Sequence, residues 1–190
     1  MPTDPIWRSN MQPYYAILGE IVSHFDRLDS GCMRLFASLV KSPAAEAIYL
    51  SARSFDLRLE MTRLALKKTK LSTPIEPGLK ALDHIAKLSG KRNAVVHGQW
   101  IMYTPVGPLR LALPEDWQEG AALLGAYFSK HPQFQKKFHK HIYNMARLEE
   151  LALEMDLAVN ELFPIVNLVH AELYPELQPK PPLSPPAQPA

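Results

Sequence analysis

The sequence predicts an all-α fold, an up-and-down bundle of four to five helices with a small β-hairpin or ordered loop inserted after the third helix. Apolar residues recur at steps of three and four along most of the chain, which is the spacing of one helix face. Seven of the 18 prolines fall in the last sixteen residues, which leaves the central stretches largely free of helix breakers. Alternation with a period of two residues, typical of strands, is confined to one stretch after His97.

The chain has the length of one domain with a tail. It contains 190 residues, of which 47% are hydrophobic and 21% charged, a balance that excludes wholesale disorder. We expect an irregular N-terminus over residues 1–12 and one helical domain over 13–174. The Pro-rich segment 175–190 lacks apolar residues for a core, so we expect it to form an extended, mobile tail.

Two helices are predicted in the first third of the chain, over residues 14–40 and about 44–70, separated by Ser42 and Pro43. The second carries two apolar stripes, and we therefore expect it to have neighbours on both sides. The stripe of the first helix consists of Ile21, Phe25, Leu28, Cys32, Leu35 and Leu39. The stripes of the second are Ile48, Ala52, Phe55, Leu59, Thr62 and Leu66, and Leu50, Leu57, Met61 and Leu64.

A third helix is predicted over residues 77–97, closed by Gly98 as a left-handed cap. Residues 99–113 alternate around a Pro-Val-Gly-Pro turn, which indicates a β-hairpin or a long ordered loop. A short helix is expected within 121–128. A long last helix is expected over 132–174, kinked or split at Pro164. Its stripe consists of Phe134, Phe138, Ile142, Met145, Leu148, Ala152, Met155, Val159, Leu162, Val166 and Val169.

Composition narrows the class of protein. The 21 basic and 19 acidic residues give a net charge of +2, which by itself does not indicate nucleic acid. The single cysteine, Cys32, excludes an internal disulfide and a multi-cysteine zinc site, and its place in an apolar stripe indicates core packing. Glu20 and His24 share a helix face, but no second such pair recurs, and we expect no metal and no cofactor. No apolar run approaches the roughly 18 residues of a membrane span, and the N-terminus lacks signal-peptide features, so we expect a cytoplasmic protein without a membrane partner.

One short motif carries most of the functional information. The third helix ends in Arg92-Asn93-Ala94-Val95-Val96-His97, where Asn93 and His97 are four apart and share a face. The two rows of residues at helical spacing that end at Arg92 and Asn93 begin with apolar residues. We therefore expect both side chains to be partly shielded from solvent, at a groove in the surface. A histidine at a helix C-terminus can titrate near neutral pH and act as a general acid or base. An arginine beside it can hold a phosphate and stabilise its charge. Together they suit cleavage of RNA without metal.

These residues resemble the signature of the HEPN superfamily, an arginine followed after four to six residues by a histidine, often with a polar residue directly after the arginine. The resemblance extends over about residues 14–172, including the placement of the motif on the third helix of a small bundle. It implies a metal-independent endoribonuclease that leaves 2′,3′-cyclic phosphate ends and acts as a homodimer, with two motifs facing one another across a shared cleft. Carried over residue by residue, His97 is the acid/base, Arg92 the phosphate ligand and Asn93 a supporting polar contact.

The resemblance also implies RNA as the partner, and a toxin or phage-defence role with an antitoxin or a nucleotidyltransferase as a further partner. Other members have lost nuclease activity, so a non-catalytic module that binds nucleotide, RNA or a protein through the same groove stays open. A purely structural interpretation also stays open, in which Arg92 pairs with Asp26, Asp29 or Asp56 and His97 caps a carbonyl.

Charge is segregated in the last third of the chain. Residues 120–148 contain five basic residues and no acid, whereas the next thirteen contain five acids and no base. We consider RNA contacts for the lysines around the motif and in this basic stretch, and a solvated face as the alternative. The acidic half of the last helix can contact a basic partner or form ordinary surface. The candidate RNA-binding residues are Lys91, Lys136, Lys137 and Lys140.

Overall fold

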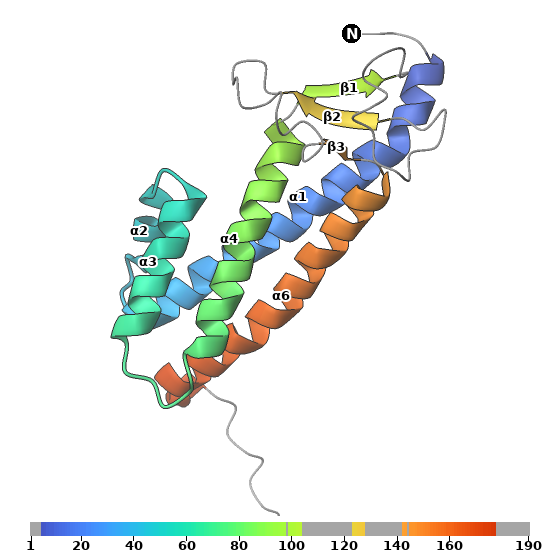
Figure 1. Ribbon diagram of the computed structural model, residues 1–190. Helices are drawn as coiled ribbons and strands as arrows, with labels where there is room; N and C mark the ends of the chain where they lie inside the picture. The colour runs from blue at the N-terminus through green and yellow to red at the C-terminus, as the bar shows by residue number, and fades with distance from the viewer. Residues whose placement is uncertain (1–4, 98, 104–122, 128–141, 144, 178–190) are drawn as a thin grey trace, which may run out of the picture.

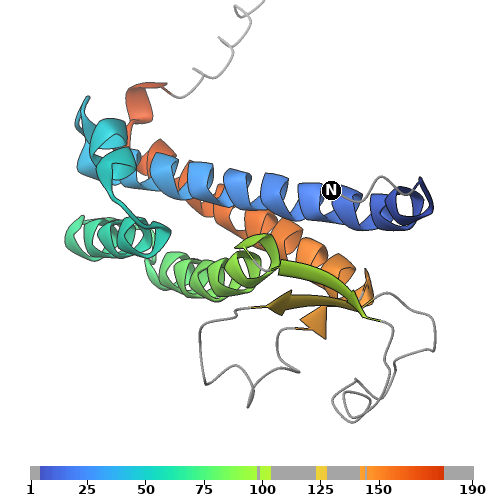
Figure 2. The same ribbon diagram turned by 90° about the horizontal axis from the view of Figure 1, so that it is seen from above.

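The structure is a computed structural model that describes residues 5–97, 99–103, 123–127, 142–143 and 145–177. Within these residues it forms a bundle of five α-helices and a small sheet (Figures 1 and 2). The predicted helical bundle is thereby confirmed. The helices are α1 (Pro5–Val40), α2 (Ala45–Ser51), α3 (Phe55–Lys68), α4 (Glu76–His97) and α6 (Met145–Leu173), and a 3₁₀ turn follows at Pro175–Leu177.

The direction of the chain alternates from helix to helix. Near the start of α4, Gly78 lies against Leu66, late in α3, and Asp83 contacts the earlier Arg63 at 2.7 Å. His84 contacts Glu161 of α6 at 3.4 Å, and Lys91, near the end of α4, contacts Glu154, near the start of α6. Helix α4 therefore runs opposite to both α3 and α6. Because α2 returns the chain after α1, helices α1, α3 and α6 all point the same way (Figure 1).

The core is built around α1. All six residues of its predicted stripe are buried, and Ile21, Leu28, Cys32 and Leu35 are fully so. Burial of each such side chain stabilises the fold by roughly 1.5–3 kcal/mol relative to exposure. Cys32 is thus a core residue, as predicted, and its burial raises the pKa of the thiol. Helix α1 lies against α2, α3, α4 and α6, and is the central element of the bundle.

The apolar stripe of α6 is also buried as predicted from Leu148 to Val169. Pro164 does not split the helix. Helices α1 and α6 approach closely at Gly31, where an added Cβ would lie 2.6 Å from the Leu162 Cδ2 atom. A side chain at this position would therefore have to displace the buried Leu162 side chain.

Three helix predictions differ from the structure. The last helix, predicted over 132–174, begins at Met145, because Ile142 and Tyr143 pair with β2 as strand β3. The N-terminus predicted to be irregular over residues 1–12 is helical from Pro5, because proline at a first helical position has a preset φ and needs no N–H bond. The predicted helix over 44–70 is broken between Ser51 and Phe55. Ser54 caps the new helix by accepting a hydrogen bond from the Leu57 N–H at 3.2 Å.

The second apolar stripe of this region is not covered as predicted. Leu50 of α2 and Leu57 and Leu64 of α3 are 49–56% exposed, whereas Met61, the fourth residue of this stripe, is partly buried against the core. The buried face carries Leu59, Thr62 and Leu66.

The small sheet replaces the predicted hairpin. Strand β1 (Gln99–Tyr103) pairs with β2 (Leu123–Tyr127), and β2 pairs with β3 (Ile142–Tyr143), both antiparallel. The hairpin predicted over 99–113 is thus not supported, because the partner of β1 is 123–127; residues 104–113 lie outside the described parts. The short helix predicted within 121–128 is wrong for the same reason, since pairing with β1 overrides the helix propensity of leucine and alanine. Residues 132–141 and 178–190 are likewise not described.

A carboxylate clamp fixes the loop before α4 to the end of α6. Glu172 accepts hydrogen bonds from the Ser72 N–H, from the Thr73 N–H at 3.0 Å and from the Thr73 hydroxyl at 2.6 Å. These hydrogen bonds lower the pKa of Glu172 to about 2, and the bond from the Thr73 hydroxyl has the largest effect. The folded state therefore favours the ionised carboxylate.

The clamp predicts a pH dependence of stability. Because the pKa is lowered on folding from 4.5 to about 2, the contribution of Glu172 is present above about pH 4.5 and is lost as the pH falls to 2. We expect Glu172→Gln to lower Tm at pH 6 and to lower it much less at pH 2, where Glu172 is partly protonated in the folded state, in thermal unfolding followed by circular dichroism. Glu176→Gln, on the adjacent exposed turn, is the matched control, and an equal effect of this control at pH 6 would contradict the clamp.

The close approach of α1 and α6 predicts opposite effects at two glycines of α1. Gly19→Ala adds a methyl group in open space and is expected to raise the free energy of unfolding by about 0.5–1 kcal/mol through helix propensity. Gly31→Ala forces the Leu162 side chain aside and is expected to lower it by about 1 kcal/mol, because overpacking outweighs propensity. Urea unfolding measures the free energy of unfolding of both variants. A stabilising effect of Gly31→Ala would contradict the close contact between Gly31 and Leu162.

Candidate functional site

The motif lies at the C-terminal end of α4, on the face that leads out of the core. Along this face Leu82 and Ile85 are fully buried, Ser89 is 2% exposed and Arg92 is half-buried. Ion pairs at the surface also join α4 to α3 and α6, but each contributes only about 0–1 kcal/mol to the stability of the fold. The position of α4 is therefore determined mainly by burial of its apolar residues. The expected shielding of Arg92 is confirmed.

Arg92 rests on an aromatic ring of α1. Its guanidinium carbon lies 4.8 Å from the centroid of the Phe25 ring, within the distance of a cation–π contact. Phe25 is itself 7% exposed and packs edge-on against Phe55 of α3, with ring centroids 4.7 Å apart. The guanidinium therefore lies where α1, α3 and α4 meet, on a floor that cannot move without disturbing the core.

Asn93 orients the guanidinium from the solvent side. The Arg92 Nη1 atom donates a hydrogen bond to the Asn93 Oδ1 atom at 3.2 Å. Asn93 is exposed, so the expectation that it would be shielded is wrong. One residue further along a helix points about 100° away from its neighbour, which takes Asn93 past the edge of the buried face.

His97 is the last residue of α4, as predicted. Its side chain is outside the described part of the structure. The backbone places it four residues after Asn93 and five after Arg92 on the same helix, so the three motif residues occupy its last two turns.

Asp29, one of the three aspartates considered as a structural partner of Arg92, is engaged by other residues. The Asp29 carboxylate accepts hydrogen bonds from the Tyr49 hydroxyl at 2.8 Å and from the Arg58 Nη1 atom at 2.7 Å, one on each oxygen. Arg58 also lies over the Tyr49 ring, with its guanidinium carbon 5.5 Å from the centroid. Burial is the main cause that raises the pKa of Tyr49. Asp29 thus joins α2 and α3 to α1 and belongs to the framework beneath the site.

The predicted RNA-binding lysines are only partly described. Lys91 is exposed next to Arg92, and its ammonium group contacts the Glu154 carboxylate of α6. Lys136, Lys137 and Lys140 lie outside the described residues. Lys91 thus follows the motif only by its place in the sequence, since its ammonium group is turned to α6, and the structure does not place the other three.

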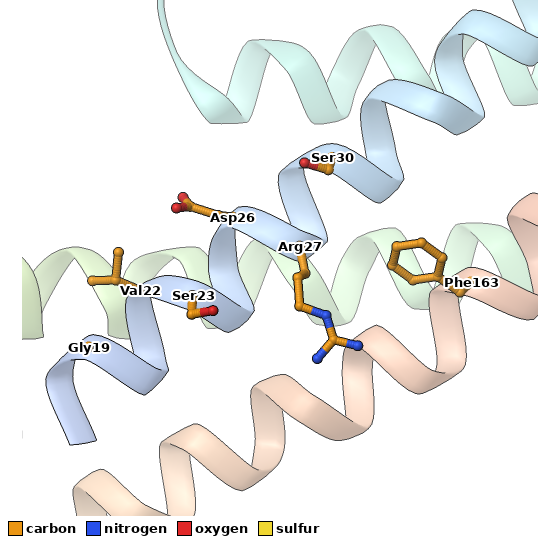
Figure 3. A pocket seen from close by; sticks show the side chains of 7 residues that line it. All are labelled: Gly19, Val22, Ser23, Asp26, Arg27, Ser30 and Phe163. Atoms are coloured by element: carbon orange, nitrogen blue, oxygen red, sulfur yellow. The ribbon is translucent and has the colours of Figure 1, made fainter. Parts of the chain in front are cut away.

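Two open hollows lie along the valley between α1 and α6, away from Arg92. One, of about 440 Å³, contains Glu20 and His24, the pair that shares a helix face in the sequence, and also Asp156. The other, of about 420 Å³, lies beside Arg27 and Phe163 (Figure 3). Within the described ranges no group of three or more side chains could hold a metal ion, and no helix is long and apolar enough to cross a membrane.

The residue that sequence reasoning missed is Phe25. It belongs to the core stripe of α1, and the sequence contains no signal that this member of the stripe lies beneath Arg92. Comparison of the chain with protein-family models, with curated proteins and with solved structures finds no match. The roles of the site residues are therefore assigned from their own chemistry.

Proposed function

We propose that the chain is a metal-independent endoribonuclease that acts as a homodimer through Arg92, Asn93 and His97. The observation that carries the proposal is the seating of Arg92, a half-buried guanidinium held between the Phe25 ring and the Asn93 amide at the end of a helix that also ends in histidine. A guanidinium fixed in this way loses little freedom when it binds a phosphate. The resemblance of the motif to the HEPN signature supports the same reaction.

The chemistry follows from the three side chains. One His97 accepts the proton of the ribose 2′-hydroxyl, and the 2′-oxygen attacks the adjacent phosphorus. The bond from phosphorus to the 5′-oxygen breaks, and that oxygen leaves with a proton, which gives a 2′,3′-cyclic phosphate and a 5′-hydroxyl. Arg92 stabilises the charge on the phosphate oxygens during the displacement. A homodimer supplies a second His97 to donate the proton to the leaving oxygen.

The further parts of the proposal concern partners. RNA is the substrate, and Lys91 is the described lysine closest in sequence to Arg92 that can contact its backbone. The contact between Lys91 and Glu154 is exposed, and exchange of that partner for a phosphate has a small cost. A toxin or defence role with an antitoxin or nucleotidyltransferase partner rests on the resemblance alone, whereas a cytoplasmic location is proposed from the sequence, which shows no membrane-length apolar run and no signal-peptide pattern.

The direct test is RNA cleavage by the purified chain in EDTA, with the new ends identified. We expect wild type to leave 2′,3′-cyclic phosphates, and His97→Ala and Arg92→Ala each to lower the rate by about 10²–10⁴-fold. His84→Ala is the matched histidine control on the same helix. Arg34→Ala is the matched arginine control, because Arg34 also lies over an aromatic ring, that of Phe163 at 5.7 Å.

Equal cleavage by wild type and both motif variants contradicts the site. Binding of RNA without turnover, weakened by Arg92→Ala, instead supports the non-catalytic module. Light scattering tests the homodimer, since a chain that stays monomeric at high concentration cannot form a cleft with two motifs.

A further inference from the structure

Helix α6 has a second apolar face that the bundle leaves uncovered. Leu153, Leu157 and Leu168 are 60%, 52% and 57% exposed, and they lie on the side opposite the buried stripe. In the described parts of the chain α6 packs against α1, α4, β3 and the 3₁₀ turn, and its Glu172 binds the loop before α4. Figure 1 shows α6 at the edge of the bundle, on the opposite side from α2 and α3.

This face has the length and the spacing of a helix-docking seam. Leu153 and Leu157 are one turn apart, and Leu168 follows three turns later, with the exposed Pro164 between them. From Leu153 to Leu168 the helix rises about 22 Å, which matches a partner helix of roughly 15 residues. An apolar row of this length fits an amphipathic helix better than a small ligand.

The valley beside this seam is shaped for long side chains. The larger hollow has an apolar floor and three carboxylates around it, and Leu153 belongs both to the hollow and to the seam. The second hollow continues the valley, and in Figure 3 Arg27 extends from α1 toward α6 beside it. Arg27, which lines the second hollow, lies 3.5 Å from Asp156, which lines the larger one. The larger hollow is lined by Ile17, Glu20, His24, Glu149, Ala152, Leu153 and Asp156.

The charge of this side of the molecule indicates the kind of partner. Of the six acidic residues of α6, Glu154, Asp156, Glu161 and Glu172 contact partners on α1, α4 or the loop before α4, which leaves Glu149 and Glu150 beside Leu153. Among the described side chains, Glu20, Glu149 and Glu150 make no ion pair, while Asp156 is already contacted by Arg27. A lysine or arginine can lay its aliphatic stem on the apolar floor of the hollow and place its cation among the carboxylates.

We propose that the outer face of α6, together with the adjoining hollow between α1 and α6, docks a basic amphipathic helix of a partner protein. A second copy of this chain fits poorly, because pairing α6 with itself sets acidic flanks against acidic flanks. The proposal goes beyond the nuclease activity and does not depend on it, since Arg92 faces α1 and α3 while this surface lies on α6.

The probe is an 18-residue helical peptide with leucines at every third or fourth position and lysines beside them. Its twin has glutamates in place of the lysines. Fluorescence anisotropy with the full chain measures both. We expect the lysine peptide to bind at least tenfold more tightly than its twin, and binding to weaken as salt is added. Leu157→Ser and Glu149→Lys are each expected to weaken binding about tenfold.

Leu64→Ser is the matched control, because Leu64 is 51% exposed on α3 and lies outside the proposed surface. Four results would overturn the proposal: no binding of the lysine peptide, equal binding of both twins, an equal effect of Leu64→Ser, or loss of self-association in Leu157→Ser by light scattering. Thermal unfolding verifies that each variant folds. RNA cleavage by Leu157→Ser is expected to equal that of wild type, which separates this surface from the nuclease site.

Discussion

The packing of α1 against α6 is the constraint on which the remaining structure depends. The two helices run in the same direction, with Gly31 of α1 closely approached by Leu162 of α6 and Ser38 3.2 Å from the His170 ring near their C-terminal ends. Parallel helices cannot be joined by a short turn, so the chain between them must reverse direction an even number of times. Helices α2, α3 and α4 and the small sheet provide these reversals, and each of the three helices packs back onto α1.

The candidate site is a consequence of this arrangement. Because α4 runs opposite to α1, its C-terminal end lies over the middle of α1, where Phe25 forms the floor under Arg92. Phe55 holds that ring from α3, so three helices determine the position of one guanidinium. The Asp29 network lies one turn further along α1 and fixes α2 and α3 beneath the same region. The functional proposal therefore rests on a group whose orientation comes from the core and not from a flexible surface.

Much of the fold could be predicted, because α1, α4 and α6 have regular apolar stripes that determine which face is buried. The half-burial of Arg92 followed from the same row, which begins at Leu82. Long-range contacts could not be predicted: the partner of β1 is 24 residues away in the sequence, and nothing local distinguishes 123–127 from a helix. The break between α2 and α3 depends on one serine cap, and a two-stripe pattern gives no sign of it. The position of Phe25 beneath Arg92 depends on how α4 crosses α1, and the apolar pattern of a single helix does not predict that crossing.

The most direct test of this account is a double-mutant cycle between Phe25 and Arg92, measured by urea unfolding of wild type, Phe25→Leu, Arg92→Ala and the double variant. If the core ring holds the guanidinium, the two substitutions are coupled by about 0.5–2 kcal/mol, the range of a partly buried cation–π contact. Additive effects, with coupling below about 0.3 kcal/mol, would show that Arg92 is not held by Phe25 and that the site has no fixed floor.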